Sequence, residues 1–125
     1  MTRKRTILIV EDNEDLRRLF RTALTLAGYE VEEAGDGLEA LYKLDQAVPD
    51  LVVLDLMLPQ ISGYVVQQEL AAHVLTREIP VVIITGSTAR LDDIGAACLL
   101  RKPVSPEQLV MTVEHCLASG SRGAV

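Results

Sequence analysis

Aromatic residues and long apolar stretches are almost missing from this sequence. Aromatic side chains make up 3 % of the 125 residues, and there is no tryptophan, so any core must be aliphatic. No apolar run approaches the ~20 residues of a membrane-spanning helix, and no secretory signal peptide is present. We therefore expect neither a membrane protein nor a secreted one, and we expect the cytoplasm as its location.

Cysteine and positive charge are also scarce. Cys98 and Cys116 have no metal-ligand spacing, and we expect both to be buried free thiols. Twelve basic against 18 acidic residues give a net charge of −6. This charge argues against direct nucleic-acid binding, which needs a basic face. The short basic cluster Arg3–Arg5 fits a solvated N-terminal end.

The sequence does contain a regular alternation of short apolar runs and amphipathic segments. A chain of this length can build one domain with its own core. We expect a single domain over residues 1–125, with a core at about 4–117 and a flexible tail at 118–125. The expected strands are 6–10, 29–34, 50–54, 80–84 and 98–100, and the expected helices are 14–27, 38–48, 64–75 and 106–117.

This alternation predicts an α/β fold. Five βα units imply one doubly wound parallel sheet with right-handed crossovers and helices on both of its faces. The run 29–34 is less apolar than the others, as an edge strand would be. Residues 86–97 must hold a loop and one more helix, and because this stretch contains Gly95 and only weak periodicity, we expect that helix to be short.

Acidic or reactive residues follow four of the apolar runs. Glu11 and Asp12 follow the first run, Asp55 the third, Thr85 the fourth, and Lys102 the last. In an open α/β sheet, ligands bind in the crevice outside the carboxyl ends of the strands. If these runs are neighbouring strands, three carboxylates, a hydroxyl and an ammonium meet in one pocket. Such a pocket would bind a divalent cation and hold a phosphoryl group on a carboxylate.

The residue types fit this chemistry one by one. A carboxylate oxygen of Asp55 can attack phosphorus and form an aspartyl phosphate. Asp12 and Asp55 can supply carboxylates to Mg²⁺, and Glu11 can hold a metal-bound water. Lys102 beside Asp55 can contact phosphoryl oxygens, and the Thr85 hydroxyl can donate to one. Each residue alone also fits a structural role, such as an acid pair at a helix N-terminus or a surface lysine.

Five motifs in order resemble the signatures of two-component response-regulator receiver domains. They are Ile7–Asn13, Asp55–Pro59, Gly63, Ile83–Gly86 and Arg101–Pro103. The resemblance covers nearly the whole chain. It implies a flavodoxin-like five-stranded sheet in the order 2-1-3-4-5. The segment from Gly86 to Ala97 departs from the family, because it is shorter than the family norm by roughly one to two helical turns, and we therefore expect a shortened fourth helix.

The resemblance also implies roles for six residues and a class of partner. The roles are phosphoacceptor for Asp55, direct Mg²⁺ ligands for Asp12, Asp55 and the backbone carbonyl of Met57, a water-mediated Mg²⁺ contact for Glu11, and phosphoryl-oxygen contacts for Thr85 and Lys102. The phosphodonor would be a phosphohistidine on a sensor histidine kinase or a histidine phosphotransfer protein. We expect a monomeric signalling domain that accepts and slowly loses a phosphoryl group, without being an enzyme in the usual sense.

One departure from the family concerns its switch residue. The family commonly has an aromatic residue three positions before the lysine, where this chain has Leu99. An aromatic switch is therefore not expected here, although movement of Thr85 is still possible in such a domain.

Three rival interpretations remain open on sequence grounds. A haloacid-dehalogenase-type phosphatase usually needs a second acid two residues after its aspartate, where this chain has Met57. A flavodoxin-like cofactor binder should have a phosphate loop rich in Ser, Thr and Gly after the first strand, where this chain has Glu11–Asn13. A receiver fold that serves only as a docking surface is the third alternative.

Overall fold

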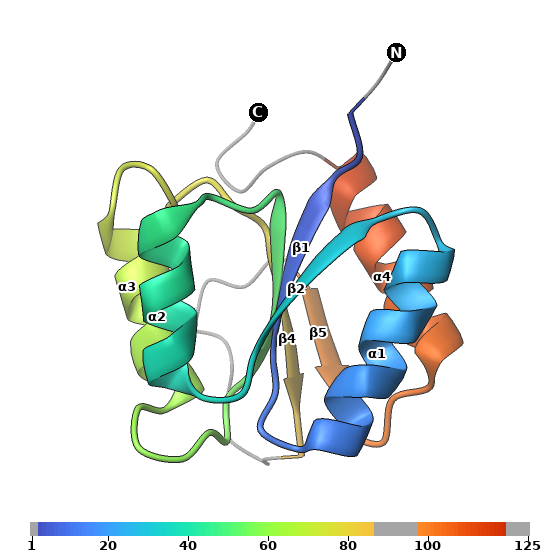
Figure 1. Cartoon of the computed structure of the whole chain (residues 1–125), viewed down its shortest axis with the longest axis horizontal. Helices are drawn as coiled ribbons and strands as arrows, with labels where there is room; N and C mark the ends of the chain where they lie inside the picture. The colour runs from blue at the N-terminus through green and yellow to red at the C-terminus, as the bar shows by residue number, and fades with distance from the viewer. Residues whose placement is uncertain (1–2, 87–97, 120–125) are drawn as a thin grey trace.

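Five parallel strands form the centre of the molecule (Figure 1). The computed structural model describes residues 3–86 and 98–119. The strands are β1 (Thr6–Val10), β2 (Glu30–Ala34), β3 (Leu51–Asp55), β4 (Val81–Thr85) and β5 (Cys98–Arg101). Their order is β2-β1-β3-β4-β5, which confirms the predicted flavodoxin-like sheet and the predicted edge position of β2.

The described helices cover the two faces of this sheet in pairs (Figure 1). The helices are α1 (Glu14–Leu26), α2 (Gly37–Gln46), α3 (Gly63–Ala72) and α4 (Pro106–Ala118). Side chains of α1 and α4 share one apolar core with the sheet. Those of α2 and α3 share a second core on the opposite face. The doubly wound α/β architecture is therefore confirmed.

Burial follows the position of each strand in the sheet. Every residue of β3 and β4 is buried, because central parallel strands are covered by helices on both faces. The outer strand β2 alternates between exposed and more buried positions, and so does β5. Cys98 on β5 is consequently only half-buried, whereas Cys116 is buried as expected.

The ends of the helices carry capping residues. The Asn13 side chain accepts a hydrogen bond from the Leu16 amide at 2.9 Å and so caps α1. Ser105 and Gln108 form a reciprocal capping box at the start of α4. Gly28 has a φ of +104° just after α1, a conformation that favours glycine.

Two helices end earlier than expected. The prediction that the third helix runs to Leu75 is wrong, because α3 ends at Ala72. The hydroxyl of buried Thr76 donates to the Leu70 carbonyl at 2.7 Å, and the Thr76 amide donates to the His73 carbonyl at 3.1 Å, so this turn replaces further helical bonds. α2 ends at Gln46 rather than at position 48, consistent with the restriction that Pro49 places on the residue before it.

Some expectations fall outside the part of the chain that the structure describes. The shortened helix expected between Gly86 and Ala97 falls on residues 87–97, and most of the expected tail falls on 120–125. Among the described helices, none has the length and apolar character needed to cross a membrane.

Candidate functional site

The strand register brings the predicted residues to one edge of the sheet. Val10 pairs with Leu54, so Glu11 lies level with Asp55. Asp55 is the last residue of β3, and Thr85 is the last residue of β4. Lys102 follows β5, and its amide donates to the Thr85 carbonyl at 2.9 Å. We call Glu11, Asp12, Asp55, Thr85 and Lys102 the carboxyl-edge pocket.

Three carboxylates of this pocket lie close together. Oxygen atoms of Glu11, Asp12 and Asp55 all lie within 4.8 Å of one another. Glu11 and Asp55 are each only 2 % exposed, whereas Asp12 is exposed. Buried carboxylates are costly unless they are paired, so the two buried acids require a cation.

Lys102 supplies that cation. Its Nζ lies 2.9 Å from Glu11 Oε1 and 3.0 Å from Asp55 Oδ2. The pairing with Asp55 was expected from the sequence, while the equally short contact with Glu11 was not. A single ammonium therefore bridges both buried acids. The peptide bond between Lys102 and Pro103 is cis.

The environment of the pocket raises the pKa values of Glu11 and Lys102. Burial raises the pKa of Glu11 above its usual value, and the nearby Asp55 carboxylate raises it further, while hydrogen bonds from Lys102 and the Asn13 amide oppose the rise. Burial lowers the pKa of Lys102, but its hydrogen bonds to Glu11 and Asp55 outweigh burial and raise the pKa overall. Lys102 therefore stays charged in this pocket.

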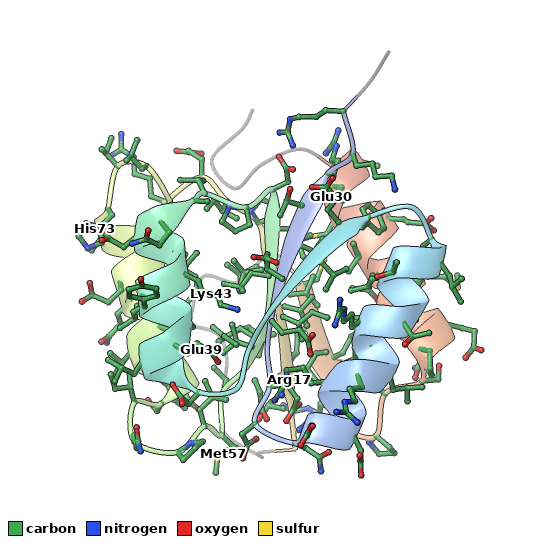
Figure 2. The ribbon with its side chains drawn as sticks, viewed as in Figure 1. Arg17, Glu30, Glu39, Lys43, Met57 and His73 are labelled. Atoms are coloured by element: carbon green, nitrogen blue, oxygen red, sulfur yellow. The ribbon has the colours of Figure 1, made fainter. Side chains whose placement is uncertain are left out.

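Backbone amides hold the two buried carboxylates in fixed orientations. The Met57 amide donates to Asp55 Oδ1 at 2.9 Å, so both oxygens of Asp55 have a donor. The Asn13 amide donates to Glu11 Oε2 at 3.1 Å. Figure 2 shows Met57 at the end of the molecule where the strands terminate, and its side chain is 60 % exposed.

Close packing after β3 depends on Gly63. A β-carbon at this position would lie 2.2 Å from the Asp55 carbonyl oxygen and 2.5 Å from the Leu56 α-carbon. The Gly63 amide donates to the Leu56 carbonyl at 3.0 Å. The start of α3 is therefore packed directly against the backbone that carries Asp55, which explains why a glycine belongs to that motif.

Arg17, an α1 residue near the rim of the pocket, makes two contacts that its position in the sequence does not specify. Its Nη1 donates to the Glu11 carbonyl at 2.8 Å, and its Nε donates to Glu33 Oε1 at 3.1 Å. Figure 2 shows Arg17 between α1 and the sheet, toward the end that carries Met57. A cation in the first turns of a helix is disfavoured by the helix dipole, and this signal could have pointed to a specific acceptor.

The structure brings most of the predicted residues together. Glu11, Asp12, Asp55 and Lys102 meet in the pocket. Thr85 is fully buried at the end of the neighbouring strand. Leu99 lies on β5 and is 40 % exposed.

The donor set of the pocket suits a hard divalent cation. Three carboxylates carry −3 and Lys102 carries +1, which leaves −2 in the ionised pocket. Oxygen ligands of this kind are those that Mg²⁺ prefers, with one or two carboxylates and phosphate oxygens completing its shell. The same arrangement presents an oriented carboxylate to an incoming electrophile.

Relatives of known family share this sequence pattern. The response regulator receiver domain family matches residues 7–114. The chain is 38 % identical over 119 residues to the probable transcriptional regulator ycf27 of Pyropia yezoensis, covering 91 % of this chain and 48 % of that protein. It is 34 % identical over 118 residues to the polar-differentiation response regulator DivK of Brucella ovis, covering 90 % of this chain and 96 % of DivK. The chain spans about half the length of the ycf27 relatives.

Solved structures share the fold. The chemotaxis response regulator CheY4 of Vibrio cholerae has a TM-score of 0.84 at 29 % identity, covering 91 % of this chain and 99 % of CheY4. The signal receiver domain of a signal transduction histidine kinase from Syntrophus aciditrophicus has a TM-score of 0.85 at 29 % identity, covering 92 % of this chain and 91 % of that one.

Proposed function

Since this chain belongs to the response-regulator receiver domains of two-component signalling, we propose that it accepts a phosphoryl group from a phosphohistidine onto Asp55. The observation that carries the proposal is the ammonium of Lys102, held between buried Asp55 and buried Glu11 beside a third carboxylate. A purely structural pair would need no third acid, and the repulsion it adds is costly.

The reaction at Asp55 is a phosphoryl transfer between two nucleophiles. A carboxylate oxygen of Asp55 forms a bond to phosphorus as the bond between phosphorus and the imidazole nitrogen of the donor breaks, and the electron pair leaves with the imidazole. The Met57 amide and Lys102 each hold one carboxylate oxygen before transfer. Asp55 is thereby oriented, and orientation is the main contribution that a protein makes to this kind of reaction.

Lys102 and Thr85 would stabilise the phosphorylated form of Asp55. Once Asp55 carries the phosphoryl group, the Lys102 ammonium can move from the carboxylate to a phosphoryl oxygen, because it is a flexible point charge. The Thr85 hydroxyl can donate to another oxygen. These new contacts would pull the ends of β4 and β5 toward Asp55 and so alter the surface that a downstream partner reads.

Mg²⁺ is the proposed cofactor. Asp12, Asp55 and the backbone carbonyl of Met57 would hold it directly, and Glu11 would bind through a water. When bound, it neutralises charge shared between the carboxylates and the phosphoryl oxygens. The exposed position of Asp12 beside buried Asp55 leaves this ligand set accessible from solvent.

The proposed donor is a sensor histidine kinase or a histidine phosphotransfer protein. We propose that the domain works as a monomer in the cytoplasm, where its two free thiols suit a reducing compartment. It would act as a phosphoacceptor that changes state rather than as an enzyme with turnover on a separate substrate.

Intact-mass spectrometry tests this function. With Mg²⁺ and acetyl phosphate or phosphoramidate, the wild-type protein should gain one base-labile phosphoryl group, and Asp55→Asn should gain none. Asp50→Asn is the matched control, because Asp50 precedes β3 and pairs with Arg3 away from the pocket. Equal labelling of wild type and Asp55→Asn would refute the acceptor. A folded wild type that is never labelled would favour the alternative, a receiver fold used only for docking.

A further inference from the structure

A second unusual surface lies between α2 and α3, apart from the carboxyl-edge pocket. Five of the eleven exposed large hydrophobic side chains among the described residues line one hollow of about 810 Å³. They are Leu38, Tyr42, Val48, Val74 and Leu75. We call this surface the α2–α3 groove. Apolar patches of this kind on soluble domains commonly mark binding surfaces.

The floor of the groove belongs to the core and is preformed. Leu44 and Leu70 line the hollow and are almost fully buried, and Leu41 packs against the same core. Val74 and Leu75 are 70 % and 75 % exposed, because α3 ends at Ala72 and the turn that follows carries them outward. The groove therefore combines a rigid floor with apolar walls.

The groove lies toward the opposite end of the helices from the pocket. Figure 2 shows His73, which lines the groove, on the outer side of α3, far from Met57 at the end where the strands terminate. Neither α2 nor α3 contributes a side chain to the carboxyl-edge pocket. A ligand in the groove would therefore leave the acceptor accessible.

The charges around the groove are acidic. Asp45 and Glu69 both line it. Asp45 is exposed and has no ion-pair partner among residues 3–86 and 98–119. Glu69 Oε2 lies 3.0 Å from His73 Nε2, a contact that is an ion pair only when the histidine is protonated. The rim thus places the carboxylates of Asp45 and Glu69 next to apolar side chains.

We propose that the α2–α3 groove docks an amphipathic helix of a partner protein, which carries aliphatic side chains at helical spacing on one face and Lys or Arg on its flank. Helices bind grooves in this way through anchors at positions i, i+3, i+4 and i+7. The two groove-forming helices supply the apolar walls, and the carboxylates of Asp45 and Glu69 supply the complement to a basic flank.

A second copy of this chain fits the groove less well. A two-fold pairing would place the same patch against itself, so Asp45 and Glu69 of one copy would face those of the other. The arginines on α1 are also engaged elsewhere: Arg17 and Arg21 contact Glu33, and Arg18 contacts Glu14. The charge pattern therefore favours a basic partner over self-association.

A titration with two synthetic helical peptides tests the proposal. Both peptides carry the same leucine stripe over about four turns, one with Lys and one with Glu on the flanking positions, and ¹⁵N-labelled protein reports the binding site by NMR. We expect shifts at Tyr42, Val48 and Leu75, and binding of the Lys peptide at least about tenfold tighter than that of the Glu peptide.

Variants locate the effect. Tyr42→Ser combined with Leu75→Ser should lower the affinity for the Lys peptide at least about tenfold. The control combines Leu26→Ser with Met111→Ser, at two exposed positions on the other helical layer, and should leave this affinity unchanged. Asp45→Lys should reduce the preference for the Lys peptide.

Several results would overturn the proposal. They are no binding, shifts outside the groove, equal affinity for both peptides, or a concentration-dependent dimer whose interface is the groove. Labelling of Asp55 by acetyl phosphate, measured in the same samples, reports separately on the proposed phosphoacceptor function, so failure of one does not imply failure of the other.

Discussion

The carboxyl-edge pocket and the α2–α3 groove reverse the usual distribution of side chains in opposite ways. Folded proteins rarely bury carboxylates, and they seldom gather exposed aliphatic residues in one place. The pocket buries Glu11 and Asp55 and compensates them within the chain, through Lys102 and two backbone amides. The exposed walls of the groove have no such internal compensation.

If both proposals hold, this difference separates the site of phosphoryl transfer from the site of partner binding in one small domain. A site whose groups are fixed by internal contacts is organised before its ligand arrives, and its parts depend on one another. Exposed side chains that lie over an already buried core contribute little to the free energy of unfolding. Substitutions in the pocket should therefore change both stability and chemistry, and those in the groove should change binding alone. The following predictions test that contrast, from the largest expected effect to the smallest.

The largest effect on stability is expected at Gly63, where the pocket depends on backbone contact. Gly63→Ala places a β-carbon 2.2 Å from the Asp55 carbonyl oxygen, so the backbone must shift. We expect a loss of about 3 kcal/mol or more in the free energy of unfolding, measured with urea. Gly86→Ala is the control, because within residues 3–86 and 98–119 the nearest atom to a β-carbon there would be the Lys102 β-carbon at 4.0 Å. Equal stability of the two variants would show that the loop after β3 is not tightly packed.

Removing the bridging cation should have the next largest effect. Lys102→Met leaves Glu11 and Asp55 buried and mutually repelling, and we expect a loss of about 2 kcal/mol, reduced from fully buried cases because Lys102 is partly exposed. Millimolar Mg²⁺ should restore more stability to this variant than to wild type. Arg18→Met removes an exposed helix pair and should change stability by less than about 0.5 kcal/mol. If Lys102→Met lowered the free energy of unfolding as little as Arg18→Met does, the buried acids would not depend on Lys102 for stability.

Asp12 should affect binding more than folding. Asp12→Ala removes one of three clustered carboxylates, so Mg²⁺ affinity should fall at least about tenfold, equivalent to ~1.4 kcal/mol. The metal-free variant should melt at the same temperature as wild type or higher, because a like charge has gone. Asp15→Ala, in the exposed first turn of α1 just after Asp12, controls for the helix dipole. Isothermal titration and thermal unfolding measure both effects, and unchanged Mg²⁺ affinity would contradict the site.

The smallest effect on stability is expected in the groove. Leu75→Ser changes a side chain that is 75 % exposed, so the free energy of unfolding should change by no more than about 0.5 kcal/mol. Leu70→Ser, on the buried floor of the same groove, should cost about 3 kcal/mol. Urea unfolding of both variants measures the difference. A large loss from Leu75→Ser would mean that the exposed walls belong to the folding core.

Local patterns predicted most of the fold and the composition of the pocket. Apolar runs marked the strands because parallel strands are covered on both faces, and caps such as Asn13 and the Ser105 box marked helix starts because they act within one turn. The pocket could be anticipated because parallel strands deliver their ends to the same edge. The order of the strands came from the family resemblance, since spacing alone does not specify it.

Contacts between segments that are distant in the sequence could not be predicted from such local patterns. The end of α3 depends on Thr76, whose hydroxyl reaches back to Leu70, and no breaker residue marks that position. The link from Arg17 to the Glu11 carbonyl depends on how α1 packs on the sheet. The groove forms only because α2 and α3 lie side by side. Residues 73–75 have a sequence that is compatible with a helix, so the turn that exposes Val74 and Leu75 could not be predicted from it.

The residual charge of the pocket has a consequence for selectivity in a crowded cell. Phosphate-bearing metabolites are abundant anions, and an ionised pocket that carries −2 repels them at close range. A divalent cation cancels that barrier, since −2 and +2 sum to zero. Under the proposed function, the pocket would therefore accept a phosphorylated donor only when the cation is also bound, and it would repel other phosphate-bearing anions when the cation is absent.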